Sequence, residues 1–117
     1  MGFSEKRKYP RVAEAVSCQL TLEGAAFAAQ TSNISCSGVL CILQRPIPLM
    51  TQMEMSFQLP GASSSRLIRC VGVVVRQQRA PDGFATAIYF SNLKQEDRRL
   101  IAEFVLQSML SHERRRS

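Results

Sequence analysis

Residues 16–23, VSCQLTLE, alternate strictly between apolar and polar side chains. The apolar positions are Val16, Cys18, Leu20 and Leu22, and the polar positions between them are Ser17, Gln19, Thr21 and Glu23. Successive side chains of an extended chain point to opposite sides, so a period of two residues gathers the apolar groups on one face. The stretch therefore predicts a half-buried β-strand.

Five further segments extend this pattern toward Phe90. They are residues 25–31, 38–43, 53–59, 66–78 and 84–90. Turn-forming stretches separate them: Glu23-Gly24, SNISCSG at 32–38, QRPIPLM at 44–50, PGASSS at 60–65 and APDG at 80–83. Gly72, inside one of these segments, indicates a β-bulge or a point of close approach. Six short strands at this spacing predict a small antiparallel barrel or a curled sandwich.

The period of the apolar residues changes after Asn92 and becomes helical. The apolar positions are now Leu93, Leu100, Ile101, Phe104, Val105 and Leu110. Asn92 and Gln95 have the spacing of a capping box, and Asp97 lies where the helix dipole favours an acid. We expect a mostly β fold, a six-stranded antiparallel barrel with a C-terminal α-helix covering one open face or end. Residues 111–117, which include His112 and three arginines, are predicted to be a solvated basic tail.

The composition favours a binding protein over an enzyme. The chain has 117 residues, the size of one domain, and a net charge of +6 that favours an anionic partner: a nucleic acid, a nucleotide or an acidic membrane surface. No apolar run is long enough for a membrane span or a signal peptide, so we expect a cytoplasmic protein. No catalytic motif is visible, because the only histidine lies in the predicted tail and no acidic pair marks a pocket.

The four cysteines predict buried free thiols. Cys18, Cys36, Cys41 and Cys70 form no CxxC pair. A metal site usually needs ligands clustered at a recognisable spacing, so we expect neither a metal nor any other cofactor. A reduced thiol packs as a small apolar side chain.

Two short stretches are candidates for binding. The first, KRKYPRV at 6–12, carries Arg7 and Arg11, and Pro10 disfavours a helix there, so residues 1–12 are predicted to be a flexible basic arm. Guanidinium groups bind phosphate and stack on flat rings, which suits a purine nucleotide. The second is NISCSG at 33–38. Taken separately, the first stretch is also compatible with a frayed terminus and the second with a plain structural turn.

Together, the two stretches resemble the PilZ domain family. RxxxR (Arg7, Arg11) is followed about twenty residues later by [D/N]xSxxG (Asn33, Ser35, Gly38). The resemblance covers residues 6–110 and extends to YPRV at 9–12, VVVR at 73–76 and AIYF at 87–90. It implies a bacterial, cytoplasmic receptor for cyclic di-GMP that changes conformation on binding and signals to a protein partner.

The resemblance also implies roles for individual residues. Arg7 and Arg11 would grip the phosphates and stack on guanine, while Asn33, Ser35 and Gly38 would contact guanine and the ligand backbone. Lys6, just before the first motif, leaves room for a pair of intercalated ligands. Arg76, at a strand end, is open to two interpretations, a further ligand contact or a solvent-facing residue.

Two other functions remain compatible with the sequence. A small basic barrel can bind nucleic acid, but such barrels expose aromatic side chains for stacking, and this chain has no Trp. The phenylalanines Phe57, Phe84 and Phe90 fall in phase with the apolar core positions. The chain could also be a PilZ-like scaffold that binds a protein without a ligand. One departure from the family is Met50-Thr51-Gln52, where many members have a glycine before the fourth strand.

Overall fold

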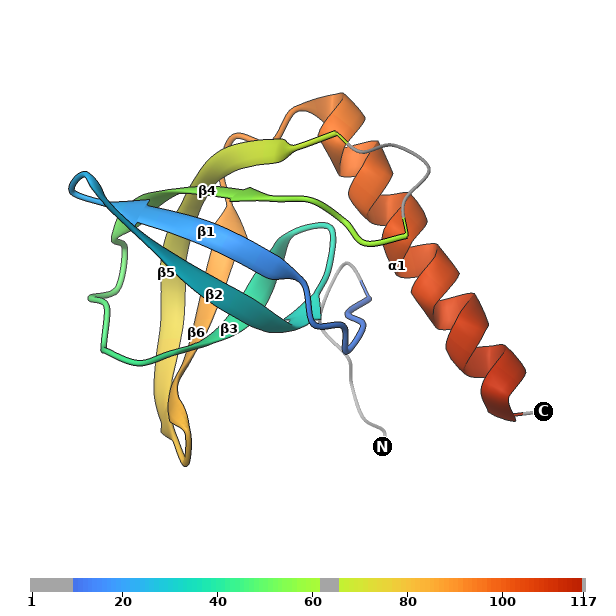
Figure 1. The fold of residues 1–117 in the computed structure, drawn as a ribbon, viewed down its shortest axis with the longest axis horizontal. Coiled ribbons are helices and arrows are strands. Elements are labelled where there is room, and N and C mark those ends of the chain that lie inside the picture. The colour runs from blue at the N-terminus through green and yellow to red at the C-terminus, as the bar shows by residue number, and fades with distance from the viewer. Residues whose placement is uncertain (1–9, 62–65, 117) are drawn as a thin grey trace.

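The computed structural model describes residues 10–61 and 66–116. Six strands form a closed antiparallel barrel in the order β1-β2-β3-β6-β5-β4 (Figure 1). They are β1 (Ser17–Leu22), β2 (Ala25–Ile34), β3 (Gly38–Leu43), β4 (Gln52–Phe57), β5 (Ile68–Ala80) and β6 (Gly83–Phe90). The predicted fold class is confirmed. Closure leaves no unpaired sheet edge, and it places β6 between β3 and β5.

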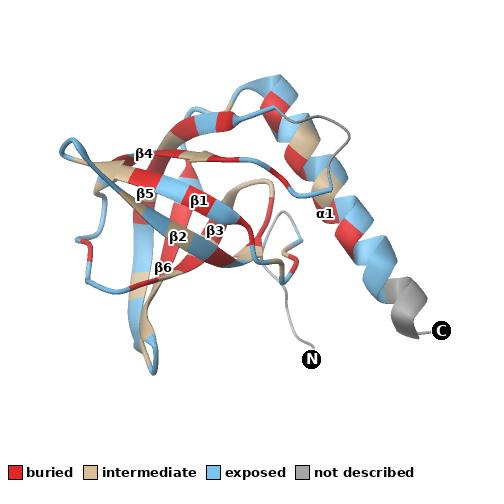
Figure 2. Cartoon of the chain, in the orientation of Figure 1, coloured by how far each residue is buried: buried red, intermediate tan, exposed pale blue. Residues whose placement is uncertain are grey.

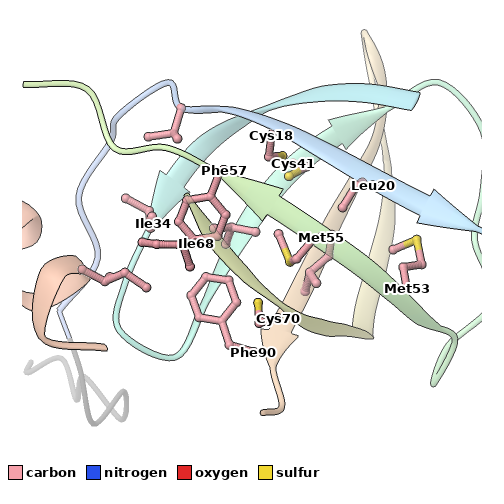
Figure 3. Close-up of a cluster of buried hydrophobic side chains, with 14 of the residues drawn as sticks. Cys18, Leu20, Ile34, Cys41, Met53, Met55, Phe57, Ile68, Cys70 and Phe90 are labelled. Carbon is pink, nitrogen blue, oxygen red and sulfur yellow. The ribbon is translucent and has the colours of Figure 1, made fainter. Parts of the chain in front are cut away.

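The alternating residues fill the barrel as the sequence predicts. Cys18 and Leu20 of β1, Met53 and Met55 of β4 and Phe90 of β6 are all buried in one cluster (Figures 2 and 3). The rings of Phe57 and Phe90 stack with centroids 5.7 Å apart. The barrel is therefore a packed core, and it positions the turns at its ends.

The helix α1 (Gln95–Arg116) lies across one end of the barrel, and its C-terminal part extends beyond it (Figure 1). Ile101 and Val105 enter the same core cluster as the strand residues. The Arg66 guanidinium pairs with the buried Asp97 carboxylate at 2.5 Å, so the start of the helix is tied to the segment before β5. Because α1 continues to Arg116, residues 111–116, predicted as a tail, are helical. In the described part of the chain, no helix has both the length and the apolarity to cross a membrane.

The predicted capping box is wrong. The Oδ1 atom of Asn92 accepts a hydrogen bond from the backbone N–H of Val71 at 2.7 Å, so this side chain binds β5 instead of the helix end. An Asn92 cap would start the helix at Leu93, but α1 begins two residues later, at Gln95, and the N–H of Arg98 donates to the carbonyl of Lys94 at 2.9 Å. A tertiary contact has replaced the local one that the spacing suggested.

β5 contains an irregularity, but not at Gly72. The register shifts between Val74 and Arg76, so Val75 is the extra residue of a bulge. Gly72 is instead a point of close approach, because an added Cβ would lie 2.5 Å from Cγ2 of Ile88 and 2.8 Å from Sδ of Met55. The second of the two predicted alternatives is therefore confirmed.

β2 is longer than predicted, and the arm is anchored at its end. Asn33 and Ile34 belong to β2, which reduces the turn before β3 to residues 35–37. Val12 is buried and forms a bridge with Ile34, with N–H to O distances of 3.0 and 2.9 Å in the two directions. The prediction of a flexible arm over residues 1–12 is therefore wrong at Val12, while residues 1–9 lie outside the described part of the chain.

Met50, in the turn before β4, has a left-handed backbone conformation, which a glycine would adopt more easily. Its φ is +70°, and its side chain is 71% exposed. A left-handed conformation costs a non-glycine residue about 1–2 kcal/mol, part of which glycine loses again through its greater entropy when unfolded. We expect Met50→Gly to raise the free energy of unfolding in urea by about 0.5–1 kcal/mol. Leu49→Gly is the control, since Leu49 is also exposed but has no positive φ, and it should lower stability.

Candidate functional site

The turn between β2 and β3 is held rigid by its own serines. The N–H of Ser35 donates to the carbonyl of Gly38 at 2.9 Å. The N–H of Ser37 donates to Oγ of Ser35 at 3.2 Å, and the two hydroxyls lie 3.1 Å apart. Ser35 is only 2% exposed, so its hydroxyl serves mainly the backbone of the turn. This local pattern is what serine side chains commonly do at turns.

The turn is also attached to β6. The N–H of Phe90 donates to the carbonyl of Ser37 at 2.9 Å, and Gly38 pairs with Tyr89 in the sheet register. A Cβ added to Gly38 would lie 2.2 Å from the carbonyl oxygen of Ile88, which is part of the backbone and cannot turn aside. Gly38 is therefore required by the packing of β3 against β6, independently of any ligand.

Arg11 reaches the same place from the N-terminal side. The two hydrogen bonds between Val12 and Ile34 bring the chain alongside the end of β2, directly before the serine turn. As a result, Arg11 lines an open hollow together with Ser35, Ser37 and Gly38. A guanidinium beside two hydroxyls and a glycine backbone is suited to an anion with polar edges.

The hollow has a volume of about 120 Å³ and a second, apolar side. That side is formed by Val75 of β5 and by Ala87, Ile88 and Tyr89 of β6. Ligand pockets usually enclose about 300–1,000 Å³, so the described residues surround only part of a nucleotide-sized molecule. A larger hollow of about 520 Å³ crosses β1, β4 and β5, but none of the predicted site residues lines it.

The structure brings three of the predicted site residues together and separates others. Arg11, Ser35 and Gly38 line one hollow. Asn33 is half-buried in β2, paired with Leu40, and lies outside the set that lines the hollow. Arg76 is exposed on β5 and pairs with Ala87, one of the lining residues. Arg7 and Lys6 lie outside the described residues.

Sequence reasoning did not single out Ser37, Tyr89 or Arg98. Ser37 lies inside the quoted turn, so its hydroxyl was visible in the motif itself. Tyr89 is the outward residue of an alternating strand, a signal that becomes informative only when its neighbour is known to be Gly38. Arg98 lies on α1, and its Nη1 donates to the carbonyl of Cys36 at 3.4 Å, which places a second guanidinium beside the turn.

The cysteines behave as buried free thiols except at the turn. Cys18, Cys41 and Cys70 are buried, and the side chains of Cys18 and Cys41 lie next to each other in the core (Figure 3). Burial raises the pKa of Cys70 to about 12, with a smaller contribution from the Asp97 carboxylate. Partial burial raises the pKa of Cys36, and the Arg98 cation opposes this rise. Within the described ranges, no three His, Cys, Asp or Glu side chains are grouped so that they could hold a metal ion.

Thiol reactivity offers a direct check of this arrangement. Only the thiolate reacts, so at pH 8 a thiol such as Cys70, with its pKa near 12, stays protonated as well as shielded. We expect a water-soluble disulfide reagent to modify Cys36, the one half-buried cysteine, before the other three. Absorbance of the released chromophore should show one faster thiol in the native protein and four after denaturation. In Cys36→Ser the faster phase should be missing; if it persists, a core cysteine is accessible.

Comparison with solved structures identifies the fold. The chain is similar to the Bacillus subtilis inhibitor of motility MotI/DgrA, with a TM-score of 0.84 and 19% identity over 92% of this chain, which spans about half (53%) of that protein. It is also similar to the Escherichia coli YcgR PilZ domain with c-di-GMP (TM-score 0.69, 12% identity, 95% of this chain and 97% of that one). A third similar structure is the K. pneumonia MrkH–c-di-GMP complex (TM-score 0.79, 18% identity, 96% of this chain and 56% of that one).

The sequence comparison is independent of these structures. Among curated proteins, none matches the chain. The family model of the PilZ domain, in contrast, matches residues 5–107. This range includes both motifs, all six strands and most of α1. The chain therefore belongs to the PilZ domain family.

Proposed function

We propose that this chain is a receptor for cyclic di-GMP. The observation that carries the proposal is the meeting of Arg11 with Ser35, Ser37 and Gly38 around one hollow, although Arg11 is more than twenty positions away in the sequence. Two of the similar structures, those of YcgR and MrkH, hold c-di-GMP. That ligand carries two phosphate charges and two purine faces, so it needs cations and polar edges at one place.

The polar part of the hollow is formed by the serine turn and by the segment that carries Arg11. The serine turn is fixed by its internal hydrogen bonds and by the bond from Phe90, so it can act as a preformed surface. Arg11, on the chain segment that enters at Pro10, lines the same hollow. Because the hollow is small, the ligand must extend past the described residues, and we propose that Arg7 and Lys6 bind the part that does.

The proposed arrangement also supplies a signal. A ligand held between the N-terminal segment and the turn joins two parts of the chain, so that free and bound protein present different surfaces to a partner protein. The turn contacts α1 through the Arg98–Cys36 hydrogen bond, which gives the binding site a physical connection to the helix. We propose that a protein partner recognises this altered surface.

Isothermal titration calorimetry with cyclic di-GMP tests the proposal. We expect binding with a micromolar or tighter dissociation constant, and the same titration reports whether one or two ligands bind. Cyclic di-AMP and a short single-stranded oligonucleotide without guanine serve as comparison ligands, since they share the phosphates but not the guanines. Absence of any heat with cyclic di-GMP would refute the proposal. Preferential binding of the oligonucleotide would favour a nucleic-acid module instead.

A further inference from the structure

Tyr89 is an aromatic residue that points out of the barrel. Its neighbours Ile88 and Phe90 point into the core and are each 2% exposed, so the alternation of β6 directs Tyr89 outward, where it is 50% exposed. It pairs with Gly38 on β3 and with Val73 on β5. Tyr89 and Gly38 both line the hollow.

The residues next to Tyr89 are apolar on one side and polar on the other. Val75, the extra residue of the β5 bulge, is also 50% exposed and lines the hollow with Ala87. The same hollow is also lined by Ser35 and Ser37 of the turn and by Arg11. A flat apolar surface next to hydroxyls and a guanidinium has the chemistry of a site for a heterocyclic base, which offers an apolar face and a polar edge.

We infer that Tyr89 is a binding residue whose ring forms the stacking surface for one purine base of the ligand, with Val75 beside it. This rests on the proposed function, because it assigns one base of the proposed ligand to the apolar half of the hollow. The volume of about 120 Å³ suits a single flat base better than the complete dinucleotide. Arg11 and the serines are then within reach of the polar parts of the same nucleotide.

The chain provides its own spectroscopic reporter for this contact. It contains two tyrosines, Tyr9 and Tyr89, and no Trp. In a Tyr9→Phe background, Tyr89 is the only tyrosine, so its fluorescence reports directly on the ring. We expect cyclic di-GMP to quench this emission in proportion to the fraction bound. The dissociation constant from quenching should equal that from calorimetry.

Substitutions at Tyr89 distinguish the contribution of the ring to binding from that of its hydroxyl. Base–aromatic stacking is worth enough that Tyr89→Leu should weaken binding by about 5- to 100-fold. Tyr89→Phe keeps the ring and should bind nearly as tightly as the wild type. Phe84→Leu is the matched control: Phe84 is a half-buried aromatic on the same strand, and it lies outside the set that lines the hollow. Its affinity should be unchanged, and thermal unfolding verifies that each variant is folded.

The outcomes distinguish this inference from the proposed function. If the wild type binds and Tyr89→Leu binds equally well, the stacking role is wrong while the receptor proposal stands. If Tyr89→Phe loses as much affinity as Tyr89→Leu, the hydroxyl and not the ring is used, and the inference is overturned. Unquenched emission at saturating ligand in the Tyr9→Phe background also overturns it. If the wild type does not bind cyclic di-GMP, both the stacking role of Tyr89 and the receptor proposal are wrong.

Discussion

Arg11→Ala is expected to weaken cyclic di-GMP binding by on the order of 2–5 kcal/mol, which is roughly a 30- to 5,000-fold rise in the dissociation constant. Among the described residues that line the hollow, Arg11 is the cationic one. Without its guanidinium, a bound phosphate would lose hydrating water and gain no hydrogen-bond donor in exchange, which is unfavourable. Arg11→Lys should fall between the wild type and Arg11→Ala, because an ammonium keeps the charge but not the paired donors of the guanidinium. Calorimetric titration of the three proteins under identical salt conditions measures the effect.

Arg69→Ala is the matched control for this experiment. Arg69 is exposed on the outer face of β5 and lines the larger hollow, away from the serine turn. Its removal lowers the net charge by the same amount as Arg11→Ala, so any general electrostatic attraction changes equally. We expect Arg69→Ala to bind almost as tightly as the wild type. Equal losses in both variants would mean that Arg11 contributes only through net charge.

The strands could be predicted from the sequence where apolar and polar residues alternate or where the residues are strongly β-forming. β3 has the predicted bounds, Gly38–Leu43, because its residues are strongly β-forming and a glycine marks its start. β2 was predicted to end at Thr31, since the turn-forming stretch SNISCSG begins directly after it, but it continues through Ser32 and Asn33 to the buried Ile34. Thr31, the last residue of the predicted segment, is polar and yet buried: its hydroxyl accepts from the N–H of Val16 and donates to the carbonyl of Glu14. A buried hydroxyl with two backbone partners behaves like a core residue, which a hydrophobicity pattern does not reveal.

The candidate site was predictable only where its residues belong to motifs. Arg11, Ser35 and Gly38 were expected to meet, and they do. Tyr89 could not be found in this way, because its place beside Gly38 depends on β6 lying next to β3 in the closed barrel. Strand order and register are set by the whole core, not by the local pattern. The capping role predicted for Asn92 was wrong for the same reason, since its side chain accepts a hydrogen bond from the N–H of Val71 on β5, which is distant in the sequence.

Gly38 has a structural role that its motif does not indicate, and this leads to the second prediction. An alanine Cβ would stand 2.2 Å from the carbonyl oxygen of Ile88, so β3 and β6 must separate locally. We expect Gly38→Ala to lower the free energy of unfolding by on the order of 3 kcal/mol without any ligand present. Affinity for cyclic di-GMP should fall as well, because the same displacement moves the serine turn. Urea unfolding monitored by circular dichroism measures the first effect, and calorimetry the second.

Gly24→Ala separates this steric effect from the loss of a glycine as such. Gly24 has a φ of +82°, and an added Cβ meets no other atom within 4 Å. The expected cost is about 1 kcal/mol, from the left-handed backbone alone, with ligand affinity unchanged because the β1–β2 turn is outside the hollow. Arg11→Ala should show the reverse pattern, a large loss of affinity with stability nearly intact. If Gly38→Ala proved as stable as the wild type yet failed to bind, the glycine would act on the ligand directly, and the barrel packing would not be the reason for its presence.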